Sequence, residues 1–199
     1  ANETVILKIT GEVLDPESIK EIKEDIYKLF SLKKLNSFGV ECITPYFKEV
    51  FSFFELKNLI LKKKFREFFV LGGGTNILFL NKITGPVIKN SIGGIKIVNE
   101  NDNAIYVSVG AGVNWHHLVL WCISKNYGGL ENLSLIPGLV GASPIQNIGA
   151  YGTEICDVFH ELECIEIKNG SKVNFNASDC KFSYLSLIHI SEPTRLRSI

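Results

Sequence analysis

The 199-residue sequence contains no methionine, no excess of either charge and no long apolar run. Its 21 Lys and Arg residues balance 21 Asp and Glu residues, which argues against nucleic acid or an anionic membrane as a partner. The longest apolar stretch, residues 68–80, is interrupted by three glycines and is shorter than the roughly 18–20 residues of a membrane-spanning helix. A hydrophobic content of 46% is typical of a globular protein and argues against disorder.

The sequence also lacks a disulfide or zinc pattern. Its five cysteines are Cys42, Cys122, Cys156, Cys164 and Cys180. Their odd number and the absence of any Cys-x-x-Cys pair predict reduced, buried thiols in a cytoplasmic protein. Residues 5–7 are too short for the core of a secretory signal, and Ala1 is expected to be either a processed terminus or not the true start.

Two helices are expected in the first third of the chain. Asp15 and Pro16 have the pattern of a helix start. Apolar residues at helical spacing follow and form one apolar face that continues to Leu29. Ser52 and Glu55 have the spacing of a capping box, which predicts a second helix from Ser52.

Short β-branched and aromatic runs predict most of the strands. They lie at residues 66–71, 77–80, 87–88, 95–98, 104–109, 161–167 and 172–175. A helix capped by Asn114 is expected after the fifth of these runs. Its predicted apolar face consists of Trp115, Leu118, Val119, Cys122 and Ile123.

The glycine run Gly72-Gly73-Gly74 is followed by Thr75 and Asn76 at the end of a predicted strand. Glycine leaves backbone amides open to close approach, and consecutive amides can bind an anion. No Gly-Lys-Ser/Thr follows, so this is not a Walker loop. From the residues alone, a structural turn and a phosphate-binding loop both remain open.

Two other motifs are weaker. Gly110-x-Gly112 has the start of a Rossmann fingerprint, but Trp115 occupies the third glycine position, which argues against that fold. His116 and His117 are adjacent, so on a helix they diverge and cannot chelate one metal. We expect them to be surface or locally bonded histidines.

Residues 128–152 are rich in glycine yet apolar and have neither helical nor strand periodicity. Long irregular segments in compact domains are usually functional or disordered, and this one is too apolar for disorder. Ser143, Gln146, Asn147 and Tyr151 offer hydrogen-bonding groups between small residues. The segment is therefore predicted to bind a long ligand that carries a polyphosphate, with a purely structural connection as the alternative.

Several stretches together resemble one family. They are residues 36–39 (NSFG), 70–78 (VLGGGTNIL), 110–115 (GAGVNW) and, above all, 129–154 (GLENLSLIPGLVGASPIQNIGAYGTE), with Cys180-x-Phe182-x-Tyr184 as a further partial match. Over residues 36–184 the chain resembles the UDP-N-acetylenolpyruvoylglucosamine reductases, flavoenzymes of bacterial cell-wall precursor synthesis.

The resemblance implies an α+β fold of the vanillyl-alcohol-oxidase and p-cresol-methylhydroxylase type. FAD would bind between two subdomains, residues 36–90 and 91–184. In the implied reaction NADPH reduces the flavin, and the enolpyruvyl sugar is then reduced to UDP-N-acetylmuramate with a proton from the protein. The implied partners are the UDP-sugar and NADPH.

The resemblance also implies a set of cofactor-binding residues. They are Gly72, Gly73, Gly74, Thr75, Asn76, Ile77, Ile136, Pro137, Gly138, Gly141, Ala142, Ser143, Pro144, Gln146, Asn147, Gly149, Ala150, Tyr151 and Gly152.

The sequence departs from the family near its end. An arginine normally follows the tyrosine matched by Tyr184, but this chain has Leu185. The family's proton-donating serine and late glutamate belong to a C-terminal substrate domain that has no match here. Residues 185–199 resemble translated cloning sequence, and residues 1–35 form an extension of uncertain origin. We therefore expect an inactive FAD-binding fragment with no catalytic residues and no metal.

Two alternatives remain at this point. The chain could be a non-catalytic flavin- or nucleotide-binding module whose tail contacts a partner, which deletion of the tail would test. It could also be a vanillyl-alcohol-type flavin oxidase, which oxygen consumption would test.

Overall fold

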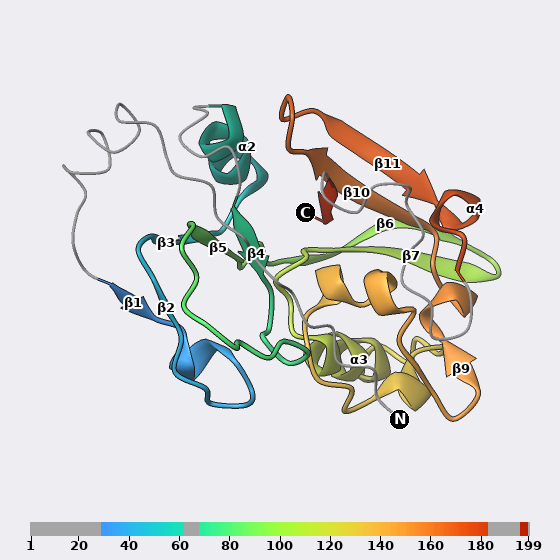
Figure 1. The fold of residues 1–199 in the computed structure, drawn as a ribbon. Coiled ribbons are helices and arrows are strands. Elements are labelled where there is room, and N and C mark those ends of the chain that lie inside the picture. The colour runs from blue at the N-terminus through green and yellow to red at the C-terminus, as the bar shows by residue number, and fades with distance from the viewer. Residues whose placement is uncertain (1–28, 62–67, 183–195, 199) are drawn as a thin grey trace.

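The computed structural model describes residues 29–61, 68–182 and 196–198. Within these ranges it shows a mixed α+β fold (Figure 1). The helix predicted to start at Asp15, the Tyr184–Leu185 position and most of the tail lie outside the described residues.

The first unit is built on a parallel sheet in the order β3-β5-β4. Its strands are β3 (Phe47–Val50), β5 (Val87–Asn90) and β4 (Phe69–Leu71), and a short antiparallel pair, β1 (Phe30–Ser31) and β2 (Ile43–Thr44), lies beside them. A 3-10 turn, η1 (Lys33–Leu35), separates β1 from β2. Because the three strands are parallel, their carboxyl ends meet at one edge of the sheet.

Helix α2 (Phe53–Leu61) follows β3 and confirms the predicted capping signal. The Glu55 amide donates to the Ser52 hydroxyl at 3.2 Å, and the Glu55 carboxylate accepts from the Phe51 amide at 2.7 Å. The reciprocal bond thus goes one residue further back than in the usual capping box.

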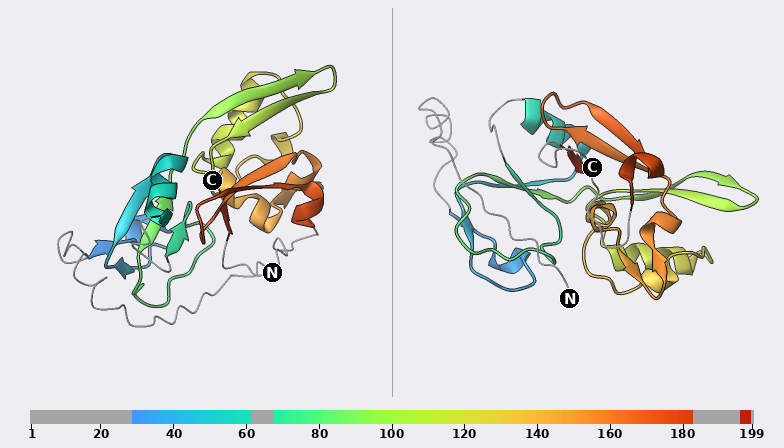
Figure 2. Two further views of the ribbon diagram at one scale, coloured as in Figure 1. Left: turned by 90° about the horizontal axis from the view of Figure 1, so that it is seen from above. Right: turned by 45° about the vertical axis from the view of Figure 1, so that its right-hand side comes forward.

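The second unit contains two larger antiparallel hairpins and the helix α3. Strands β6 (Ile95–Asn101) and β7 (Ala104–Val109) form the first hairpin, which extends away from the rest of the molecule (Figure 2). Helix α3 (Trp115–Ser124) comes next, and β10 (Glu161–Glu166) pairs with β11 (Lys172–Asn176) and with β12 (Leu196–Ser198). A four-residue helix, α4 (Ala177–Cys180), follows β11.

The predicted capping and face of α3 are largely confirmed. The Asn114 side chain accepts a hydrogen bond from the His117 amide at 3.0 Å. Trp115, Leu118, Val119 and Cys122 are buried, but Ile123 is 48% exposed. Its inclusion in the buried face was wrong, because nearly half of its side chain is exposed in the last turn of the helix.

The strand predicted at residues 77–80 is also wrong. This stretch is irregular and pairs with none of the described strands. Ile77 and Phe79 pack with the first core cluster around Leu32, Leu71 and Val87. The apolar pattern therefore indicates that these side chains are buried, and an irregular segment that covers a core buries them just as a strand does. The strand predicted from Arg66 is described only from Phe69 onward.

The long glycine-rich segment is ordered into very short elements. They are η2 (Glu131–Leu133), η3 (Val140–Ala142), η4 (Pro144–Gln146), β8 (Gly149–Ala150), β9 (Thr153–Glu154) and η5 (Ile155–Asp157). The segment has neither a long helix nor a long strand, in keeping with its lack of periodicity, and its role in binding stays a prediction.

Three core clusters hold the fold together. The first lies on one face of the parallel sheet, and the second surrounds α3. The third joins α2 and the sheet to β10, because Ile165 of β10 packs with Val50, Leu56 and Ile88. The β10–β11 turn also meets α2, since a Cβ on Gly170 would lie 3.3 Å from Leu61.

The boundary at residue 90 between the two predicted FAD-binding subdomains stays a prediction.

All five cysteines are free thiols, and four of them are buried. Cys156 is half-buried. Burial raises the pKa of the Cys164 thiol to about 12, with smaller contributions from Cys180 and Glu163. The predicted burial is confirmed for every cysteine except the partly accessible Cys156, and their reduced state stays a prediction. Within the described ranges, no helix is both long enough and apolar enough to cross a membrane.

Replacement of Ile165 by alanine tests the packing of β10 on the first unit. Ile165 is fully buried, so we expect the free energy of unfolding to fall by about 2–5 kcal/mol in urea titrations. The matched control is Ile97→Ala in β6, where the side chain is 46% exposed and the change should stay within about 0.5 kcal/mol. Equal losses for the two variants would contradict this packing.

Candidate functional site: an amide-lined loop at the sheet edge

The glycine run forms a loop that leaves the carboxyl end of β4. Leu71 pairs with Lys89 of β5, so Gly72 is the first residue beyond the parallel sheet. The backbone amides of residues 72–77 donate no hydrogen bond to any acceptor in the described part of the chain. Six successive amides without an acceptor are unusual in a folded protein, because such groups are normally paired. The loop is therefore equipped to bind an anion.

Glycine is required in this loop by close backbone approach. Gly74 has φ +64°, and a Cβ there would lie 1.9 Å from the carbonyl oxygen of Leu35. No side chain fits at that distance without displacing the backbone of residues 35–36. The loop thus takes its shape from the first unit.

The second predicted segment lies directly against this loop. A Cβ on Gly73 would be 3.3 Å from the Cα of Gly138, and a Cβ on Gly138 would be 3.3 Å from the Thr75 hydroxyl oxygen. Gly72 similarly faces Leu139 at 3.8 Å. The structure therefore brings together two stretches that lie more than 60 residues apart in the sequence, as the site prediction requires.

Backbone hydrogen bonds attach this second segment to the start of α3. The Trp115 amide donates to the Gly138 carbonyl at 3.1 Å, and the Val140 amide donates to the Val113 carbonyl at 2.9 Å. The Trp115 ring nitrogen donates to the Leu133 carbonyl at 2.8 Å inside the second core cluster. Trp115 therefore fixes residues 133–138 through both its ring and its backbone amide.

The Gly110-x-Gly112 motif has a structural role. A Cβ on Gly110 would lie 2.3 Å from the Ile92 carbonyl oxygen, and one on Gly112 would lie 2.5 Å from Ser91. The motif follows β7, which pairs antiparallel with β6, rather than a strand of a parallel sheet. The antiparallel pairing of β7 argues against the Rossmann interpretation, because that fingerprint follows a strand of a parallel sheet.

The remaining predicted site residues divide into two groups. Thr75 and Asn76 are half-buried, and their side chains have no hydrogen-bond partner among the described residues. Ser143 and Asn147 are buried and use their side chains within the chain. The Ser143 hydroxyl donates to the Val140 carbonyl, and the Asn147 amide donates to Glu154. These last two side chains stabilise the segment's turns.

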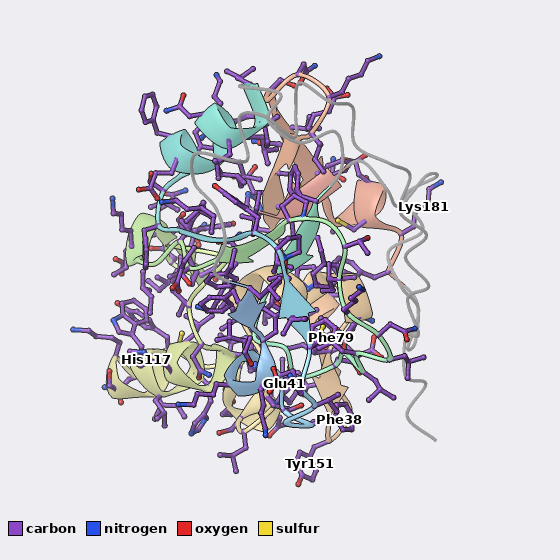
Figure 3. All side chains as sticks on the ribbon, turned by 60° about the vertical axis from the view of Figure 1, so that its left-hand side comes forward. Phe38, Glu41, Phe79, His117, Tyr151 and Lys181 are labelled. Carbon is purple, nitrogen blue, oxygen red and sulfur yellow. The ribbon has the colours of Figure 1, made fainter. Side chains whose placement is uncertain are left out.

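The other predicted residues continue along the same path, away from the loop. Gly141 and Ala142 lie in η3, Pro144 and Gln146 in η4, and Gly149 and Ala150 in β8. Tyr151 and Gly152 form the tip of the β8–β9 hairpin, where Tyr151 is 90% exposed and extends from the surface (Figure 3). Ile136 packs against the second core cluster.

The two histidines of α3 do not form a metal site. The His116 ring accepts a hydrogen bond from the Leu135 amide at 3.2 Å, whereas His117 is exposed. Across the described ranges, no group of three His, Cys, Asp or Glu side chains could hold a metal ion.

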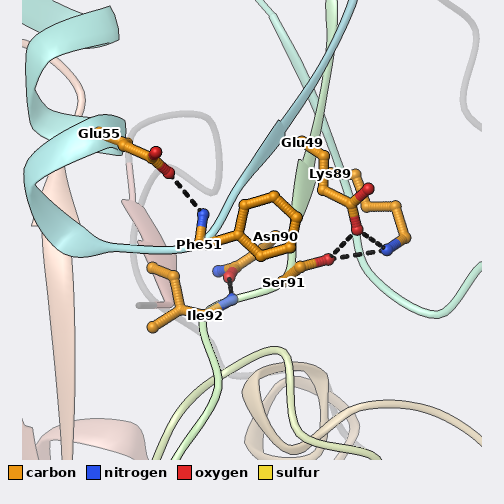
Figure 4. Close-up of polar contacts among 7 residues, drawn as sticks. All are labelled: Glu49, Phe51, Glu55, Lys89, Asn90, Ser91 and Ile92. Carbon is orange, nitrogen blue, oxygen red and sulfur yellow. Dashed lines mark hydrogen bonds and ion pairs between the residues drawn. The ribbon is translucent and has the colours of Figure 1, made fainter.

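A polar cluster that sequence reasoning missed lies at the same edge of the sheet. The Glu49 carboxylate accepts from the Lys89 ammonium and from the Ser91 hydroxyl (Figure 4). These two bonds lower the pKa of Glu49, with Lys89 as the larger cause. The signal was faint, because only the parallel pairing of β3 with β5 places Glu49 opposite Lys89.

An amide-lined loop at the edge of a parallel sheet, with a second glycine-rich segment against it, has the geometry that binds anions in other proteins. The chain matches the family described as the FAD binding domain over residues 60–176, which is more than half of its length. It belongs to that family.

Two relatives are named UDP-N-acetylenolpyruvoylglucosamine reductase. The protein from Amoebophilus asiaticus is 49% identical over 162 residues, which cover 80% of this chain and 48% of the relative. The protein from Flavobacterium johnsoniae is 44% identical over 168 residues, which cover 84% and 50%. The chain thus spans about half the length of the curated relatives it matches.

A solved structure supports the fold. It is the UDP-N-acetylenolpyruvylglucosamine reductase (MurB) from Thermus caldophilus, with a TM-score of 0.62 and 24% sequence identity. The match covers 86% of this chain and 61% of that one. This likeness confirms the α+β FAD-binding fold.

Replacement of Gly74 by alanine tests the shape of the loop. The added Cβ meets the Leu35 carbonyl, so we expect a clear loss of thermal stability and a loss of ligand binding. The control is Gly85→Ala, where an added Cβ meets nothing within 4 Å. A Gly74→Ala chain that melts and binds like the Gly85→Ala chain would contradict the close approach.

The Glu49 cluster makes a prediction about acid stability. The folded pKa of Glu49 lies below its ordinary value of 4.5, so its stabilisation is complete above that pH and is lost as the pH falls further. Glu49→Gln should therefore flatten the acid side of the stability profile measured by urea unfolding. Glu163→Gln, which removes the half-exposed pair with Lys172, should leave that slope nearly unchanged.

Proposed function

We propose that this chain binds FAD along the junction of residues 72–77 and residues 136–139. We further propose that it is the flavin-binding part of an NADPH-dependent UDP-N-acetylenolpyruvoylglucosamine reductase of peptidoglycan synthesis in the bacterial cytoplasm. Residues 36–90 and 91–184 form its two FAD-binding subdomains. Most of the chain's length thus serves cofactor binding.

The row of unpaired amides at residues 72–77 carries this proposal. FAD contains a diphosphate whose oxygens accept hydrogen bonds, and the loop offers donors that nothing else in the described chain uses. The loop has no cation of its own, so neutral amide dipoles bind the charge. Thr75 and Asn76 add two side chains of the right chemistry at the same place.

Each segment has a separate task in this proposal. The loop binds the diphosphate, and Gly138 leaves room for it because its φ of +126° and missing Cβ let the chain pass close to Thr75. Residues 139–152 continue from there, so they follow the ribityl chain and the flavin ring. Bound FAD would supply the hydride-transfer chemistry that amino-acid side chains lack.

The loop itself, residues 72–77, carries no Lys or Arg side chain that could stabilise charge on a reacting sugar, and the nearby Lys89 is paired with Glu49. Position 185 carries leucine where the resemblance implies arginine. We therefore propose that this chain binds FAD without turning over the enolpyruvyl sugar. The UDP-sugar and NADPH are substrates of the longer enzyme.

Reconstitution with FAD tests the proposal. The purified chain, mixed with excess FAD and desalted, should retain the yellow flavin absorbance and should show no NADPH-dependent reduction of the enolpyruvyl sugar. A folded chain that retains no flavin would contradict the binding, and measurable turnover would contradict the absence of catalysis.

A point substitution locates the binding site. Asn76→Ala removes an unpaired loop side chain and should weaken FAD binding by about 2- to 10-fold, the value of one hydrogen bond. The control is Asn103→Ala at the exposed tip of the β6–β7 hairpin, which should leave the FAD dissociation constant unchanged. Equal dissociation constants for the two variants would place the cofactor elsewhere.

A further inference from the structure

The turn at residues 36–39 makes contacts with the glycine loop that the proposed function does not explain. The Ser37 amide donates to the Gly74 carbonyl at 3.0 Å. The Ser37 hydroxyl lies 3.4 Å from the same oxygen and 3.3 Å from the Thr75 carbonyl oxygen. A hydroxyl has one hydrogen, so it serves these two carbonyls in turn.

These contacts determine which way the loop amides point. In a trans peptide the C=O and the following N–H lie in one plane and point in opposite directions. All described peptide bonds are trans. Because the carbonyls of Gly74 and Thr75 face Ser37, the amides of Thr75 and Asn76 face away from it. Two neighbouring amides that point the same way form an anion-binding concavity.

The turn itself is held rigidly by Asn36. Its side-chain amide is buried and donates to the carbonyls of Leu32, at 2.9 Å, and Val40, at 3.0 Å. Its side-chain oxygen accepts from the Val40 amide at 3.1 Å. With both ends of the amide satisfied, the turn has a fixed position against the loop.

We propose that Ser37 is a positioning residue that aims the amides of Thr75 and Asn76 at the diphosphate of FAD. This inference rests on the proposed function and adds to it a residue outside the glycine loop. Ser37 does not contact the ligand itself. It turns the loop carbonyls inward, so that the amides are oriented before the ligand arrives.

Proline at position 37 is a sharp test, because it removes both the amide and the hydroxyl. The turn is closed by a bond from the Gly39 amide to the Asn36 carbonyl at 3.1 Å, which makes Ser37 its second residue, where proline is favoured. Asn36 has φ −136° and ψ 143°, a conformation compatible with a following proline. The fold should therefore tolerate Ser37→Pro.

The experiment compares FAD, which has the diphosphate, with riboflavin, which has no phosphate. Ser37→Pro should weaken FAD binding by about tenfold and Ser37→Ala by about threefold, each measured by flavin fluorescence. Riboflavin affinity should be unchanged in both. Asp102→Pro, at the second position of the β6–β7 turn, is the matched proline control and should bind both ligands like the unmodified chain.

Three results would overturn the inference. FAD affinity that is unchanged in Ser37→Pro would show that the turn does not orient the amides. Equal losses for FAD and riboflavin would show a general structural role. If Ser37→Pro fails to fold, the affinities of Ser37→Ala for FAD and riboflavin are compared instead, and the same two outcomes overturn the inference. An unmodified chain that binds riboflavin but gains nothing from the diphosphate of FAD would instead contradict the proposed function, and the inference with it.

Discussion

The close approach of the Gly74 backbone to the carbonyl of Leu35 is the constraint on which the site depends. It forces a residue without a side chain into a left-handed conformation and brings the loop within hydrogen-bonding distance of Ser37. A glycine in this position costs conformational entropy on folding. The contacts that fix the turn offset this cost, and the loop is left with a row of amides that have no acceptor among the described residues.

The rest of the structure supports this loop from two sides. On one side the first core cluster packs under β4 and fixes the point where the loop begins. On the other side Trp115 binds residues 133–138 through its ring and its amide, so Gly138 lies against Gly73. Ile165 then ties β10 to the first unit. The candidate site is thus a junction of backbone segments.

Much of this could be predicted from the sequence, and what failed has a physical explanation. The cap of α3, the strands from Val87 to Val109 and the β10–β11 hairpin follow from local patterns, which need no knowledge of distant contacts. The strand predicted at residues 77–80 failed because an apolar run indicates burial and leaves the hydrogen-bonding partner undefined. The glycine loop and residues 136–138 were predicted as binding residues, which stays a prediction, and their contact with one another and the proposed role of Ser37 are tertiary features. No spacing in the sequence reveals that residue 37 lies beside residue 74.

Hydrogen–deuterium exchange of the backbone, with and without FAD, tests the central claim most directly. Exposed amides without an acceptor exchange fast, and a bound diphosphate should slow them. The account predicts fast exchange at residues 72–77 in the free chain and strong protection there, and at residues 138–139, when FAD is bound. Protection that appears elsewhere while residues 72–77 continue to exchange fast would contradict it.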